Sequence, residues 1–127
     1  MANNALQAVT TAVVRVGRLL STFELYAKRV DLNTVGQSNQ RLTQLVNDDI
    51  HLAELGIQAA LDHVWGENLT SLDFALDEVR KARLAYFSPV ADSAAQAYGH
   101  IRSASGFLQT AICRLATESP ASPTELN

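Results

Sequence analysis

The chain has 127 residues, of which 47% are hydrophobic and 18% are charged, and its formal net charge is −3. This size and apolar content suit one compact domain, which we expect over residues 1–117, and leave little room for a second. The 10 basic residues are scattered along the chain, which argues against a nucleic-acid backbone as a partner.

The first predicted helix spans about residues 4–30. Its apolar side chains recur at alternating steps of three and four, as in a helix that packs against other helices: Leu6, Val9, Val13, Val16, Leu20, Phe23, Ala27 and Val30. Arg15 and Arg18 interrupt the apolar run before it reaches the roughly 20 residues that a membrane-spanning helix needs. No basic leader precedes it, as a signal peptide would require. We therefore expect a cytoplasmic protein without a membrane segment.

The second predicted helix spans about residues 36–65. Its start lies between Thr34 and Arg41, because the polar run before Arg41 has no helical periodicity. One face collects the apolar residues Leu42, Val46, Ile50, Ala53, Ile57, Ala60 and Val64. Gly66 is the predicted C-terminal stop, since glycine readily adopts the left-handed conformation that ends many helices.

The third predicted helix spans about residues 70–87. Thr70 and Asp73 have the spacing of a capping box, in which each side chain bonds a free backbone N–H of the first turn. The expected core face comprises Leu72, Leu76, Val79 and Tyr86, flanked by Ala75 and Ala82. A basic cluster follows, which we interpret as cations that complement the helix dipole rather than as a binding patch: Arg80, Lys81 and Arg83.

The fourth predicted helix spans about residues 89–116, with Ser88 as its N-cap and Pro89 at its first position. Its apolar face repeats the three-and-four stepping through Ala94, Tyr98, Ile101, Ser105, Leu108, Ile112 and Leu115. Glycine inside a helix costs about 0.5–1 kcal/mol relative to alanine. We therefore expect Gly99 and Gly106 to lie under a crossing helix, the alternative being a kink.

Four amphipathic helices joined by short connections predict an all-α, antiparallel up-down four-helix bundle. No segment of the chain has the alternating pattern of a half-buried strand. Residues 118–127 lack the apolar content that would offset the entropy of ordering them, so we expect a flexible C-terminal tail.

A metal or haem centre is one chemistry to consider, because helical bundles often hold such groups between inward carboxylates and histidines. Asp48, His51 and Glu54 have a spacing that would serve a metal ion, but they fall on a surface opposite the apolar face. A solvated face is the simpler interpretation, so we expect no metal and no other cofactor. The alternative is a metal- or haem-binding bundle, for which the candidate ligands are His51, His63 and His100.

Nucleophilic catalysis finds no support in the sequence. Cys113 is the one cysteine, so no intrachain disulfide forms, a reducing compartment is the simplest setting, and we expect a packed thiol. The chain has neither the Gly-x-Ser-x-Gly turn of serine hydrolases nor a glycine-rich phosphate loop. We expect no enzymatic activity and no small-molecule substrate.

Apolar residues outside the predicted core faces are the strongest functional signal. Val14, Leu25, Phe74 and Phe107 all lie off those faces, and exposed aromatic residues often anchor protein interfaces. We therefore expect a non-enzymatic interaction module that binds a protein partner or further copies of itself, as an adaptor, chaperone-like protein or assembly subunit. The alternative is a small acidic inhibitor or immunity-type protein that blocks an enzyme or a nucleic-acid-binding protein.

Overall fold

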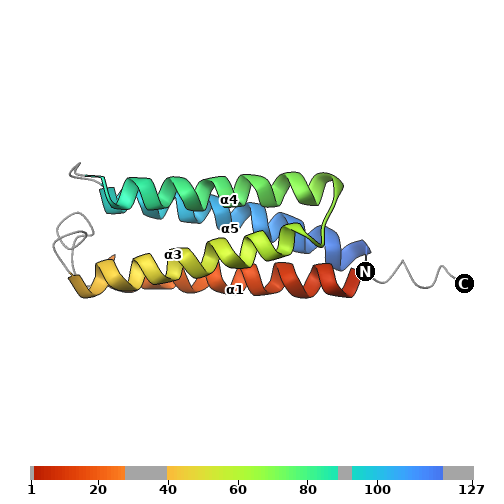
Figure 1. Ribbon diagram of the computed structural model, residues 1–127, viewed down its shortest axis with the longest axis horizontal. Helices are drawn as coiled ribbons and strands as arrows, with labels where there is room; N and C mark the ends of the chain where they lie inside the picture. The colour runs from red at the N-terminus through yellow and green to blue at the C-terminus, as the bar shows by residue number, and fades with distance from the viewer. Residues whose placement is uncertain (1, 28–39, 89–92, 119–127) are drawn as a thin grey trace, which may run out of the picture.

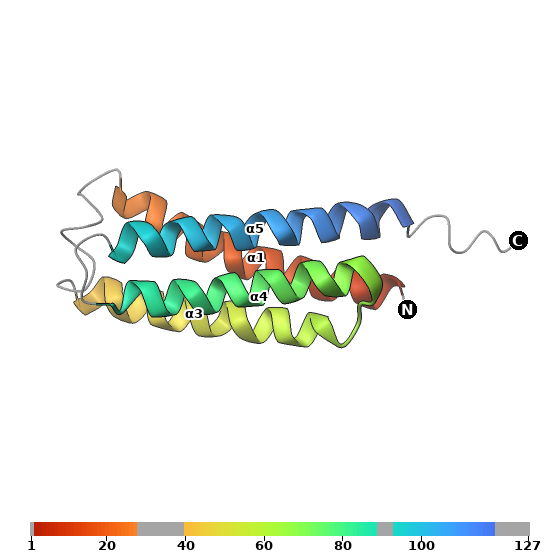
Figure 2. The same cartoon turned by 90° about the horizontal axis from the view of Figure 1, so that it is seen from above.

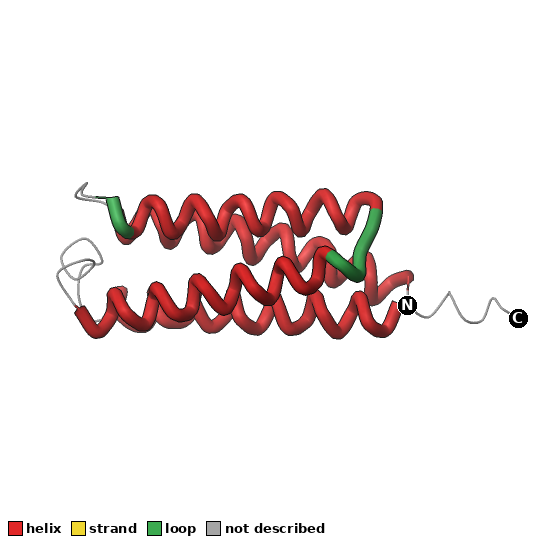
Figure 3. Tube along the Cα trace, in the orientation of Figure 1, coloured by secondary structure: helices red, strands yellow, loops and turns green. Residues whose placement is uncertain are grey.

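The structure, a computed structural model, describes residues 2–27, 40–88 and 93–118. These residues form four helices, α1 (Ala2–Ala27), α3 (Gln40–Leu61), α4 (Gly66–Tyr86) and α5 (Ser93–Glu118). No strand occurs within the described ranges, and helix accounts for nearly all of them (Figure 3). The all-α prediction is confirmed.

The four helices form an antiparallel bundle in which each contacts two neighbours. α1 packs against α3 and α5, and α4 packs against the same two helices from the other side. Figure 1 shows α4 and α5 as one layer over α1 and α3, with successive helices running in opposite directions. Figure 2, turned by 90°, shows α5 beside α1 and α4 beside α3. This is the predicted up-down bundle.

The core row of α1 is rotated from the predicted one. Its fully buried residues are Ala5, Val9, Ala12, Val16, Leu19 and Phe23, whereas Leu6, Val13 and Leu20 only pack against the edge of the core. The rotation follows from packing, because α1 lies between α3 and α5 and the row between those two contacts faces inward. Periodicity within one helix gives the width of an apolar face but not its centre.

The core rows of α4 and α5 combine alanine with larger residues. The predicted α4 residues are all buried, and so are Ala94, Ile101, Leu108 and Leu115 of α5. Aromatic rings fill one end of the core, where Phe23 meets Tyr86 edge-on with ring centroids 5.9 Å apart. Asn68 is also buried in the α4 row, and its Oδ1 has no hydrogen-bond partner among the described residues.

The junction between α3 and α4 differs from the prediction. α3 ends at Leu61 rather than near residue 65, and α4 begins at Gly66 rather than at Thr70. Trp65 has the extended backbone of an N-cap, and Gly66 has a φ of 62°, a conformation that glycine adopts without strain. Gly66 therefore opens a helix instead of ending one. The predicted capping box is wrong, because Thr70 lies inside α4 and donates to the carbonyl of Gly66.

Several predicted helix ends fall on residues outside the described ranges. α1 is described to Ala27 and α3 from Gln40, so the predicted limits at residues 30 and 36 are not covered. Pro89 also lies outside the described residues, and the described part of α5 begins at Ser93. That helix continues through Glu118, two residues beyond its predicted end. The remainder of the predicted tail, residues 119–127, is not described.

The two glycines of α5 do not lie under a crossing helix. Both are exposed, and a Cβ at Gly99 or Gly106 would meet nothing within 4 Å. The prediction assumed that a close helix contact offsets the cost of a helical glycine. In this bundle Gly56 of α3 makes such a contact instead, with α1. Within the described residues, no helix is long and apolar enough to cross a membrane.

Candidate functional site

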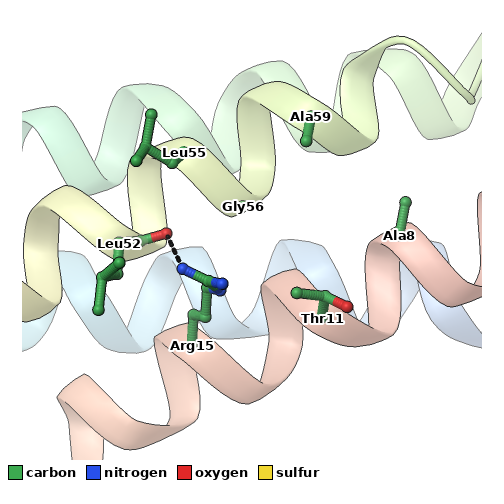
Figure 4. A pocket seen from close by; sticks show the side chains of 7 residues that line it. All are labelled: Ala8, Thr11, Arg15, Leu52, Leu55, Gly56 and Ala59. Carbon is green, nitrogen blue, oxygen red and sulfur yellow. Dashed lines mark hydrogen bonds between the residues drawn. The ribbon is translucent and has the colours of Figure 1, made fainter.

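A groove runs along the outer side of the α1/α3 pair. Its central section has a volume of about 400 Å³ (Figure 4). α1 contributes Ala8, Thr11 and Arg15 to this section, and α3 contributes Leu52, Leu55, Gly56 and Ala59. Ala8 and Ala59 point toward each other across it in the close view.

The hollow continues beyond this central section in both directions. Ala8 and Thr11 also line a second hollow that extends to Asn4, Gln7 and His63. At the other end, Arg15 and Leu52 also line a third hollow, which extends to Val14, Arg18 and Asp49. Because neighbouring hollows share lining residues, the three form a row along the seam, which we call the α1/α3 groove.

Small side chains at the helix contact create the groove. A Cβ at position 56 would lie 3.0 Å from the Cδ of Arg15 and 3.5 Å from the Cα of Ala12, so Gly56 allows the two helices to approach closely. Beside this contact, Ala8 and Ala59 are too short to fill the outer side of the seam between the helices. The antiparallel register of α1 and α3 thus brings their small residues together.

The groove exposes apolar side chains on both of its helices. The exposed fraction is 63% for Val14, 39% for Leu52 and 46% for Leu55. A single exposed apolar residue is ordinary, but several around one concave surface are typical of a protein interface. Val14 was predicted from the sequence, whereas the two leucines were not.

The charged groups that line the groove are mainly cationic. Nη1 of Arg15 donates a long hydrogen bond of 3.4 Å to the carbonyl of Leu52, and this side chain makes no ion pair with any described residue. Arg18 is exposed, and its Nε lies 3.7 Å from Oδ1 of Asp49. Asp49 is buried and also accepts a 3.5 Å hydrogen bond from Thr22. The one described carboxylate that lines the groove is therefore already engaged.

A second apolar surface lies on the opposite layer, between α4 and α5. The rings of Phe74 and Phe107 are stacked, with centroids 5.2 Å apart and an angle of 25° between their planes. Phe74 is 52% exposed, whereas Phe107 is half-buried and packs against the core. The structure brings these two predicted residues together, and we call them the phenylalanine pair.

The four predicted partner-binding residues do not form one surface. Val14 lies in the α1/α3 groove, and the phenylalanine pair lies in the other layer of the bundle. Leu25 belongs to α1, but its side chain lies outside the described part of the structure. The predicted partner-binding residues with described side chains therefore fall on two separate surfaces.

The candidate metal ligands Asp48, His51 and Glu54 do not form a metal site. Asp48 and His51 are exposed, as expected for a solvated face, but Glu54 is only 8% exposed, so its predicted place on that face is wrong. Its carboxylate lies 2.6 Å from Nη1 of Arg83 and 3.6 Å from Nε of Arg80, both on α4. Glu54 thus joins α3 to α4, and these two arginines serve an interhelical ion pair. No group of three metal-ligating side chains gathers within the described residues.

The other candidate ligands and the thiol are also dispersed. His63 is exposed at one end of the groove, and His100 lies 2.7 Å from Oε1 of Glu78 on α4. Cys113 is exposed, so the predicted packed thiol is wrong. None of these side chains faces another across the core, which is the arrangement that a haem between axial histidines requires.

Comparisons with protein-family models, with curated proteins and with solved structures found no match to this chain. One signal of the groove was present in the sequence, because Ala8, Gly56 and Ala59 are small residues beside predicted core faces. Only the register between α1 and α3 reveals that they lie together.

Proposed function

We propose that this protein is a non-enzymatic interaction module that binds another protein in the α1/α3 groove. The observation that carries the proposal is the row of three adjoining hollows along the groove, from Asn4 and His63 at one end to Arg18 and Asp49 at the other. Elongated grooves with apolar walls are a recurrent site for segments of partner proteins.

The architecture supports binding rather than catalysis. Apart from His63 at one end, the groove is lined by residues of two packed helices, so the core holds its shape. Its polar groups are two arginines, an engaged carboxylate, His63 and neutral side chains, and the hydroxyl of Thr11 donates to the carbonyl of Gln7 rather than to His63. This arrangement offers recognition chemistry without an activated nucleophile. The groove also leaves Val14 and Leu52 available for burial against a partner.

Site-specific photo-crosslinking in cells that make the protein tests the proposal. A photoreactive amino acid replaces Val14 or Leu52 in the groove, and a matched control carries it at Gln58, which is exposed on α3 but does not line the groove. We expect a discrete protein adduct from the two groove positions that the Gln58 variant does not form. Equal adducts from all three positions, or none from any, would refute the proposal.

A second candidate function is self-association through the phenylalanine pair. It rests on the half-exposed ring of Phe74, which presents a flat aromatic surface between α4 and α5. Sedimentation of the wild type, Phe74→Asp and Leu84→Asp tests it, because Leu84 is a more exposed apolar residue on the same helix. We expect Phe74→Asp alone to dissociate an oligomer, and a wild type that sediments as a monomer at all concentrations contradicts this function.

A further inference from the structure

The chemistry of the α1/α3 groove specifies its occupant more closely. We infer that the groove binds an amphipathic helix that presents an apolar stripe to Val14 and Leu52 and a carboxylate to Arg15. The inference rests on the proposed function, since it names the kind of partner that the same groove takes.

Length and shape favour a helix over a small molecule. From Asn4 to Arg18 the groove follows α1 for about 21 Å at 1.5 Å per residue, which is close to four helical turns. Pockets for small molecules usually enclose most of the ligand surface, whereas the leucines of this groove and Val14 remain substantially exposed. A helix laid along the seam would cover all three with residues spaced three and four apart.

Charge complementarity favours an acidic partner. The protein as a whole is acidic, with a net charge of −3, yet the groove is lined by two arginines and by one carboxylate that already pairs with Arg18. Burying the Arg15 guanidinium under a partner without a counter-charge would be costly. A carboxylate at that point would instead form a charge-assisted, bidentate hydrogen bond.

The position of Arg15 makes it a suitable anchor. Its side chain is half-buried in the central section of the groove and rises from α1 toward α3 (Figure 4). The bond to the Leu52 carbonyl holds the guanidinium across the groove, and its remaining N–H groups have no carboxylate partner among the described residues. A preorganised arginine loses less conformational entropy when it binds a carboxylate.

Selection from a displayed library tests the inference. The intact protein is the target, and the probe is a library of peptides of about 16 residues with helix-forming backbones and random surface positions. We expect enrichment of peptides with apolar residues at i, i+3 or i+4, and i+7, together with one recurrent Glu or Asp. Enriched peptides without that acidic residue would overturn the inference.

A charge swap then tests the role of Arg15. We expect Arg15→Glu and Arg15→Met each to lower the affinity for the selected peptide by about tenfold or more. A peptide in which Lys replaces the recurrent Glu should bind the Arg15→Glu variant more tightly than it binds the wild-type protein. Arg102→Glu is the matched control, since Arg102 lies over the Tyr98 ring on α5, away from the groove. Melting curves establish that each variant is folded. Undiminished binding of the acidic peptide to both Arg15 variants would overturn the inference.

The outcomes separate this inference from the proposed function. If groove positions crosslink a partner but selected peptides are insensitive to charge, the groove binds proteins and only the acidic helix is wrong. If sedimentation shows a dimer that Leu52→Glu dissociates, the occupant is a second copy and the inference also fails. If neither crosslinks nor selected peptides depend on the groove, both proposals fail.

Discussion

The two layers of the bundle are each an antiparallel helix pair, but their outer seams differ. The α4/α5 seam is filled by side chains that meet across it: Arg114 with Ser71 and Glu67, Phe107 with Phe74, and His100 with Glu78. The α1/α3 seam is also crossed, by Arg18 with Asp49 and by Arg15 with the Leu52 carbonyl. Its other flanking residues include the small Ala8, Gly56 and Ala59, which leave a groove. The size of the residues that flank the core rows therefore decides which helix pair is closed and which stays open.

This difference implies a division of roles. Long side chains across a seam contribute contacts and hydrogen bonds to folding, so their removal should lower the free energy of unfolding. Exposed side chains beside a groove contribute little to folding and are available for binding. The closed seam should respond to mutation mainly in stability, and the open seam mainly in partner affinity.

The largest expected effect is at the phenylalanine pair. Phe107→Ala should lower the free energy of unfolding by about 2–3 kcal/mol, because Phe107 packs against the core as well as against Phe74. Phe74→Ala should cost less, since half of its side chain already contacts water. Denaturant unfolding of both variants and of the double variant measures this, with an expected coupling of about 0.5–1.5 kcal/mol. Strict additivity would show that the stacked rings do not stabilise the seam.

A smaller effect is expected at the polar contact of the same seam. His100→Ala should destabilise the protein by about 1 kcal/mol, because it removes the hydrogen bond to the half-buried carboxylate of Glu78. His51→Ala is the control, since His51 is exposed on α3. Chemical unfolding of the two variants checks the difference. Equal free energies of unfolding would mean that the pair contributes nothing to the closed seam.

Much of the fold could be predicted from periodicity, and so could single surface residues such as Val14, but not how the surface residues come together. The three-and-four stepping of apolar residues predicts four helices, whatever their packing. The predicted core residues of α4 are all buried. The centre of the α1 core row was not predicted, because it depends on the two helices that flank α1. The burial of Glu54 was missed for a similar reason, since its arginine partners lie on another helix.

The glycines also show that a single helix does not determine which residues are packed. Gly99 and Gly106 were expected to be packed because of their cost to a helix, yet both are open to solvent. Gly56, which the sequence did not distinguish from them, makes the close helix contact. The cost of a residue in isolation thus predicts its environment poorly, because only the register between helices determines which glycine meets a neighbour.

This contrast predicts opposite responses to alanine. Gly99→Ala should stabilise the protein by about 0.5–1 kcal/mol, because the new methyl group meets no atom and the unfolded chain loses entropy. Gly56→Ala should gain less, since its Cβ would press on the stem of Arg15 at 3.0 Å. Thermal melts of the two variants measure the difference. A larger gain at Gly56 would show that the contact beneath the groove is looser than described.

The smallest effect on stability is expected at the rim of the groove. Val14→Ala should leave the free energy of unfolding within about 0.5 kcal/mol of wild type, because the valine is 63% exposed and alanine is the better helix former. The same variant should lower the affinity of a groove ligand, because the apolar area of the Val14 side chain is buried only in the complex. Unfolding curves and binding titrations on one preparation separate the two effects. If Val14→Ala lowers the stability but leaves the affinity for the ligand unchanged, Val14 contributes to folding as the α4/α5 contacts do, and the two layers do not differ in role.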